Sequence, residues 1–151
     1  MFSGCYAGVR KGPGFFWEKE WGGISVELYI EHWLPVAAVF FHENQLDLYQ
    51  QDNAPAHRAR ITAQALREMR MPTLKWPANS LDLNPIKNVW AILKLEIAET
   101  NDIQALDLPQ LREAVIRAWA TITPETLLAL SRSMVWRLTK VIENNGGSIR
   151  T

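Results

Sequence analysis

The feature that most constrains the fold is a change of pattern along the chain. Short strand-like segments alternate with helical segments up to about residue 85, and only helical segments follow. This order predicts an α/β domain, a mixed sheet flanked by helices, with a helical C-terminal extension. A chain of 151 residues buries enough surface on folding to form a real hydrophobic core.

The strand-like segments lie mostly near the N-terminus. Residues 1–9 and 15–17 are apolar or aromatic, and the breaker segment 10–14 between them predicts the turn of a β-hairpin. Residues 46–51 predict a strand whose C-terminal end places Asp52 next to a turn. Another short strand is expected at 73–76.

Helices are predicted between and after these strands, over residues 24–41, 56–70 and 85–97. Pro35 should kink the first of them. Asn84 should cap the third, with Pro85 in its first turn. This places Lys87 in the first turn as well.

Two amphipathic helices complete the chain. Asp107 and Gln110 form a capping box before a helix that runs to Ile122. Thr123 and Pro124 open the last helix, which stops at residues 144–147. Its apolar stripe is expected to consist of Leu127, Leu130, Met134, Leu138 and Val141.

The formal net charge is zero because basic segments of the chain are balanced by acidic ones. Residues 58–94 hold seven basic and two acidic side chains, which would attract a phosphate backbone. Solvated helix faces are the alternative explanation of the same charges. The candidate nucleic-acid contacts are His57, Arg58, Arg60, Arg67, Lys75 and Lys94. Such contacts would bind DNA without sequence preference.

The remaining composition excludes several classes of protein. Cys5 is the single cysteine and has no partner for an internal disulfide, which favours a reducing compartment. The longest apolar run, residues 33–41, is far too short to cross a bilayer, and no signal-peptide pattern follows Met1. We expect neither a membrane partner nor a small-molecule substrate.

Two separated motifs carry a family resemblance. They read Gln51-Asp52-Asn53-Ala54-Pro55-Ala56-His57 and Trp76-Pro77-Ala78-Asn79-Ser80-Leu81-Asp82-Leu83-Asn84-Pro85-Ile86-Lys87-Asn88-Val89-Trp90. Together with residues 12–13, 16–22 and the ending 145–147, they resemble the DDE catalytic domain of mariner-type transposases of the Tc/mariner superfamily, most closely the fungal members. The resemblance covers nearly the whole chain.

This resemblance implies a ribonuclease-H-like fold that lacks its first strand, formed by one partial domain over residues 1–151. It also implies that the family's DNA-reading helix-turn-helix domain is not part of these residues. A nuclear location, DNA as partner and a homodimer follow from the same resemblance.

In that family, three carboxylates hold two divalent ions, Mg²⁺ or Mn²⁺, which activate the attacking oxygen and stabilise the leaving oxygen. Asp52 matches the second of these acids and is a vestigial metal ligand. Lys87 stands where the final acid is expected, and the strand that carries the first acid would precede Met1. Only one of the three acids is therefore retained.

An ammonium group has no acceptor, so Lys87 cannot ligate a metal ion. We expect it instead to form an ion pair with Asp52 where the metal would have bound. Asp82 is expected to act as a turn residue, and Glu96 and Glu99 lie too far along the helix to replace the acid. The chain is therefore predicted to be catalytically inactive.

Three alternatives remain open at this point. The chain could be an active metal-dependent nuclease or strand transferase if upstream sequence supplies the first acid. It could also be a repurposed DNA-binding module or a poorly folding gene fragment. Trp90 and Trp119 are expected in the core, whereas Trp17, Trp21 and Trp136 could either pack or stack on bases.

Overall fold

The computed structural model describes residues 1–74 and 80–149. Contacts divide the chain into two compact units, and each is described by itself. The first unit consists of Met1–Cys5 and Gly12–Asn84, and the second of Tyr6–Lys11 and the residues from Pro85 onward. That residues 1–151 form a single domain stays a prediction.

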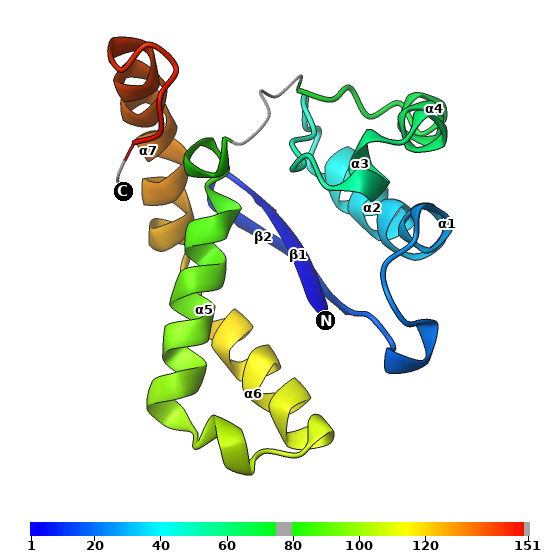
Figure 1. Cartoon of the computed structure of the whole chain (residues 1–151), viewed down its shortest axis with the longest axis vertical. Helices are drawn as coiled ribbons and strands as arrows, with labels where there is room; N and C mark the ends of the chain where they lie inside the picture. The colour runs from blue at the N-terminus through cyan, green and yellow to red at the C-terminus, as the bar shows by residue number, and fades with distance from the viewer. Residues whose placement is uncertain (75–79, 150–151) are drawn as a thin grey trace. The chain divides into compact units, whose positions relative to one another are not determined.

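Strands β1 (Phe2–Ala7) and β2 (Arg10–Phe16) form a two-stranded sheet, as the predicted hairpin requires (Figure 1). The predicted turn position was wrong, because the chain reverses at Gly8 (φ +57°) and the breaker segment 10–14 lies within β2. Gly12 is needed for close packing: a Cβ there would lie 2.9 Å from the Cys5 carbonyl oxygen and would collide with its Sγ.

The first unit continues through a short 3₁₀ turn, η1 (Lys19–Trp21), into a helical segment. This segment comprises α1 (Val26–Leu28), the π-helical η2 (Tyr29–Trp33) and α2 (Leu34–Glu43). The predicted helix over 24–41 is thus confirmed in position. The segment is irregular at η2, a π-helical turn that ends two residues before Pro35, and Pro35 lies in the first turn of α2.

The strands predicted at 46–51 and 73–76 are reduced to one parallel bridge between Tyr49 and Thr73. The Tyr49 amide donates to the Pro72 carbonyl at 2.8 Å, and the Leu74 amide donates to the Tyr49 carbonyl at 3.1 Å. These two bonds hold the segment that leads into Asp52. The remainder of the second strand prediction falls on residues outside the described part.

The helix predicted over 56–70 is interrupted. Ala59 has an extended ψ of 142° and separates α3 (Pro55–Arg58) from α4 (Arg60–Glu68). The buried Thr62 hydroxyl donates to the Ala56 carbonyl at 2.6 Å, so an α4 side chain satisfies a carbonyl of α3 across the break. The helical spacing of the apolar residues continues across Ala59, so it does not predict this interruption.

A hydrophobic core joins these helices to the hairpin strands of the first unit. In Figure 1, α1, α2, α3 and α4 lie together. The buried members of the cluster are Trp17, Tyr29, Trp33, Leu34, Ala37, Phe41, Ala56, Ala65, Leu66 and Met71. A short 3₁₀ turn, η3 (Leu81–Leu83), ends the unit. Trp17, one of the undecided tryptophans, is therefore a core residue.

The second unit contains α5 (Ile86–Thr100), the 3₁₀ turn η4 (Ile103–Ala105), α6 (Leu108–Thr121) and α7 (Pro124–Glu143). Helices α5 and α6 pack against each other (Figure 1). The rings of Trp90 and Trp119 stack with their centroids 5.6 Å apart. The predicted Asn84 cap was wrong, since Pro85 is the N-cap of α5 and no side chain caps it.

Both ends of α6 are satisfied by side chains. The predicted capping box is confirmed: Asp107 accepts the Gln110 amide at 2.8 Å, and Gln110 accepts the Asp107 amide at 2.9 Å. At the other end, the Lys11 ammonium donates to three carbonyls, at 2.6 Å from Trp119, 3.0 Å from Ala120 and 3.2 Å from Ile122. The positive charge of Lys11 also interacts favourably with the partial negative charge at the C-terminal end of the helix.

The buried face of α7 differs from the prediction. Leu127 is fully buried as expected, but Leu138 is 44% exposed, and Arg137 is buried instead. The Arg137 Nε donates to the Ser133 hydroxyl at 2.9 Å, which satisfies part of this buried guanidinium. No helix within the described residues is long and apolar enough to span a bilayer.

Candidate functional site

Asp52 lies in the loop between the Tyr49 bridge and α3, three residues before Pro55. Its Oδ1 accepts the amide of Ala54 at 3.1 Å. A carboxylate that accepts an amide two residues along the chain fixes the local turn. The hydrogen bond within the loop therefore helps to fix the position of the Asp52 carboxylate.

His57 is the direct side-chain partner of Asp52. Its Nδ1 lies 2.7 Å from Oδ1 of Asp52 and 3.1 Å from the Asp52 backbone carbonyl. The two side chains are 20% and 31% exposed, so water has limited access to the pair. His57 stays a predicted phosphate contact, and the structure shows that its ring pairs with Asp52, the acid that matches the family motif.

Tyr29 and Gln51 stabilise this motif through ring packing and hydrogen bonds. The Tyr29 ring lies 4.4 Å from the His57 ring, and its hydroxyl donates to Gln51 Oε1 at 2.8 Å. The Gln51 Nε2 donates in turn to the His57 carbonyl at 3.2 Å. Tyr29 and Gln51 therefore restrain both the ring and the backbone of His57.

Two further aromatic residues extend this network into the core. The Tyr29 and Tyr49 hydroxyls lie 3.2 Å apart, and Trp33 Nε1 donates to the Tyr49 hydroxyl at 3.0 Å. Desolvation by burial raises the pKa of Tyr29 and of Tyr49, which favours the neutral phenol of each even at alkaline pH. No sequence motif marks these residues, although the spacing of Tyr29 and Trp33 places them on one helix face.

The donor set around Asp52 does not fit a two-ion magnesium centre. Magnesium prefers oxygen ligands, and a DDE site needs several carboxylates, whereas the Asp52 neighbour is an imidazole. Within residues 1–74 and 80–149, no group of three or more His, Cys, Asp or Glu side chains is placed to hold a metal ion. That Mg²⁺ or Mn²⁺ is not bound productively in this chain stays a prediction.

Lys87 is the second residue of α5, as predicted from the motif. It belongs to the second unit, and Asp52 belongs to the first. The ion pair expected between them stays a prediction. Asp82 lies in the η3 turn, consistent with its predicted local role.

The basic candidates divide between the two units. Arg58, Arg60 and Arg67 are exposed on α3 and α4 of the first unit. Positions 60 and 67 are seven residues apart and share one helix face. Lys94 is exposed on α5 of the second unit, and Lys75 lies outside the described residues.

Comparisons with known proteins identify the lineage. Residues 45–108 match the family model described as DDE superfamily endonuclease. The chain is 36% identical to the Tc3 transposase of Caenorhabditis elegans over 101 residues, which cover 67% of this chain and 30% of that protein. It is 32% identical to the Tcb1 transposase of Caenorhabditis briggsae over 99 residues, covering 66% of this chain and 35% of that protein. The chain thus spans about a third of the length of these relatives.

Solved structures show the same fold. A structure of the Mos1 strand transfer complex matches with a TM-score of 0.80 at 15% identity, covering 99% of this chain and 43% of that chain. A crystal structure of the Mos1 mariner transposase catalytic domain matches with a TM-score of 0.70 at 17% identity, covering 85% and 65%. The expected closeness to fungal members stays a prediction. The sequence and fold matches agree with the motifs around Asp52 and Lys87, and the chain is a Tc/mariner-type DDE domain with a ribonuclease-H-like fold.

Proposed function

We propose that this chain is a transposase-derived domain that binds DNA through the phosphate backbone and does not cleave it. The observation that carries the proposal is the pairing of Asp52 with His57 at 2.7 Å. In this arrangement, the retained acid faces an imidazole instead of a second carboxylate. Two metal ions need more negative charge than one such acid supplies.

The residue at the third acid position supports the loss of cleavage. Lys87 contributes a positive charge and no lone pair at the place of a carboxylate. The related Mos1 catalytic domain has been solved with Mg and with Mn, so divalent ions belong to the lineage. In this chain, we propose that Mg²⁺ or Mn²⁺ is not bound productively.

The DNA-binding part of the proposal rests on three exposed guanidinium groups. Arg58, Arg60 and Arg67 form no ion pair with an acid within the described residues. Guanidinium groups suit phosphate oxygens because their N–H donors form a planar fork. Binding at this surface would be non-specific, with a homodimer and a nuclear location as further expectations from the lineage.

A plasmid assay tests the loss of cleavage. Supercoiled DNA is incubated with the chain and Mg²⁺ or Mn²⁺, and nicked product is compared with that formed by an Asp52→Asn variant. We expect no nicking above the level of this variant. Metal-dependent nicking that disappears in Asp52→Asn would contradict the proposed inactivity.

A salt titration tests the DNA contacts separately. Neutralising Arg58, Arg60 and Arg67 with glutamine should reduce the slope of log affinity against log salt by about 0.9 for each phosphate that an arginine no longer neutralises. The matched control is Arg117→Gln on α6, where an exposed arginine pairs with Glu113 at 3.4 Å. An unchanged slope in the triple variant would contradict the proposed phosphate contacts of these three arginines.

A further inference from the structure

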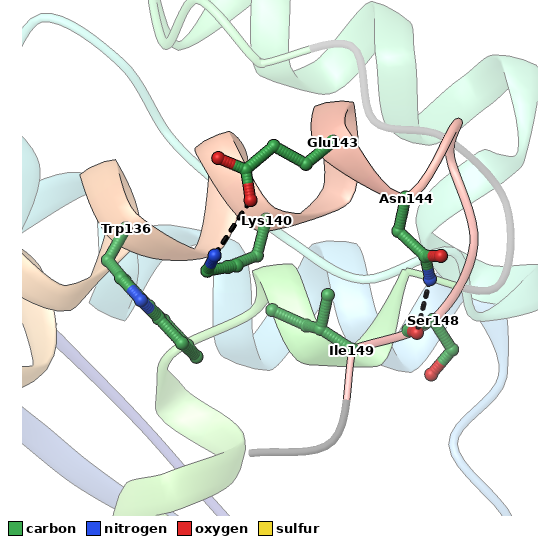
Figure 2. A pocket seen from close by; sticks show the side chains of 6 residues that line it. All are labelled: Trp136, Lys140, Glu143, Asn144, Ser148 and Ile149. Carbon is green, nitrogen blue, oxygen red and sulfur yellow. Dashed lines mark hydrogen bonds and ion pairs between the residues drawn. The ribbon is translucent and has the colours of Figure 1, made fainter.

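A pocket of about 430 Å³ lies at the C-terminal end of α7, within the second unit (Figure 2). It is separate from the motif around Asp52, which belongs to the first unit. Its lining residues are Trp136, Lys140, Glu143, Asn144, Ser148 and Ile149. A pocket of this size can hold a small organic group.

Trp136 supplies the aromatic wall of the pocket. Its side chain is 50% exposed, although tryptophan usually buries most of its surface. By contrast, Trp17, Trp33 and Trp119 are all less than 10% exposed. An exposed indole beside a pocket offers a flat surface on which a planar ring can stack.

Lys140 places a cation one helical turn from this indole. Its Nζ lies 2.7 Å from Oε2 of Glu143, which occupies one of the three N–H donors of the ammonium. Among the residues that line the pocket, Lys140 is the only cation. The two remaining N–H donors of this ammonium can contact an anionic group of a ligand.

The chain reversal after α7 closes the opposite wall. Gly146 has φ +82°, and the Asn144 side-chain amide donates to the Ser148 carbonyl at 3.0 Å. This turn returns Ile149 to the pocket, where it adds an apolar surface (Figure 2). An aromatic wall, an apolar wall and an ammonium group together suit a planar ring that carries a phosphate.

From this geometry, we propose that the pocket receives an unpaired base of a single-stranded nucleic acid. The base stacks on Trp136, and the Lys140 ammonium contacts the adjacent phosphate. Bases inside a duplex are already stacked and cannot enter, so the pocket would distinguish single strands from duplexes. This inference rests on the proposed nucleic-acid binding and adds the strand type that is bound.

The test measures fluorescence anisotropy of a labelled oligothymidylate and of a labelled duplex at low salt. Trp136→Ala should weaken single-strand binding about 5- to 150-fold, as expected when one base loses its stacking partner. Duplex binding should stay within about twofold. Trp136→Phe should retain most of the single-strand affinity because the phenyl ring can still stack.

Val135→Ala is the matched control, because Val135 is 74% exposed on the same helix and does not line the pocket. An unchanged single-strand affinity in Trp136→Ala, or an equal loss with both probes, would overturn the inference. If the duplex still binds in either case, the proposed backbone binding survives. If the unmodified chain binds neither probe at low salt, both proposals fail.

Discussion

The imidazole of His57 and the carboxylate of Asp52 lie 2.7 Å apart and join the two ends of one short motif. The loop between them is fixed by the Ala54 amide, which donates to the same carboxylate oxygen. The acid inherited from the lineage therefore has a local structural role that requires no metal ion.

We predict a measurable coupling between these two residues. His57→Ala should lower the free energy of unfolding by about 1 to 2 kcal/mol, since it removes a hydrogen bond to a charged group and the packing on Tyr29. Urea denaturation of His57→Ala, Asp52→Asn and the double variant gives the coupling energy. Additive effects of the two substitutions would show that the pair contributes nothing to stability.

Gly12→Ala should destabilise the hairpin by about 1 to 3 kcal/mol, because the new methyl group would overlap the Cys5 side chain and carbonyl. Thermal unfolding followed by circular dichroism measures the loss. Gly23→Ala is the control, because nothing lies within 4 Å of a Cβ at that position. Equal melting temperatures for the two variants would contradict the close strand approach.

Burial raises the pKa of the Cys5 thiol from 9.0 to about 12. The folded chain thus retains a proton that the unfolded chain releases near pH 9, so the contribution of Cys5 to stability falls as the pH rises from about 9 to 12. Cys5→Ala should remove this component of the slope. A thiol reagent at pH 9 should also react about 500-fold more slowly with the native chain than with the urea-unfolded chain, in proportion to the fraction of thiolate.

Lys11→Met should reduce the free energy of unfolding by about 1 to 2 kcal/mol. The methionine retains much of the apolar stem but leaves the three carbonyls at the end of α6 without their ammonium donor. Chemical denaturation gives the value, and Lys19→Met, at an exposed lysine, serves as control. A loss no larger than that of the control would show that water replaces the ammonium at no cost.

Arg137→Ala should cost about 2 to 4 kcal/mol, because it empties a buried position of α7 and removes the donor to Ser133. Arg132→Ala, at an exposed position of the same helix, should change stability by less than about 0.5 kcal/mol. Denaturant midpoints compare the two variants. A loss of stability below about 0.5 kcal/mol for Arg137→Ala would contradict the predicted contribution of the buried guanidinium.

The sequence predicted elements whose signals are local. The Asp107 and Gln110 capping box needs only its own residues, and the motif around Asp52 indicated both the lineage and the fold. Patterns set by distant contacts were misinterpreted. Gly12 reads as a turn residue but packs against Cys5, and Ala59 interrupts a helix whose apolar period continues without a break.

The network behind the candidate site escaped prediction for a similar reason. Tyr49 is 16 residues from Trp33 and 20 from Tyr29 along the chain, and only tertiary folding brings its hydroxyl within hydrogen-bonding distance of both. Arg137 occupies a position at which apolar periodicity favours a leucine. The Ser133 hydroxyl accepts one of its guanidinium donors, which offsets part of the cost of burying this charge.

The path of the backbone has a practical consequence for dissecting the molecule. It passes from one compact unit to the other after Cys5, after Lys11 and after Asn84. Severing the chain at Asn84 would consequently not release two autonomous halves, because the C-terminal fragment would lack the lysine that anchors the end of α6. Limited proteolysis or split expression at this junction should yield fragments that regain their structure only when mixed.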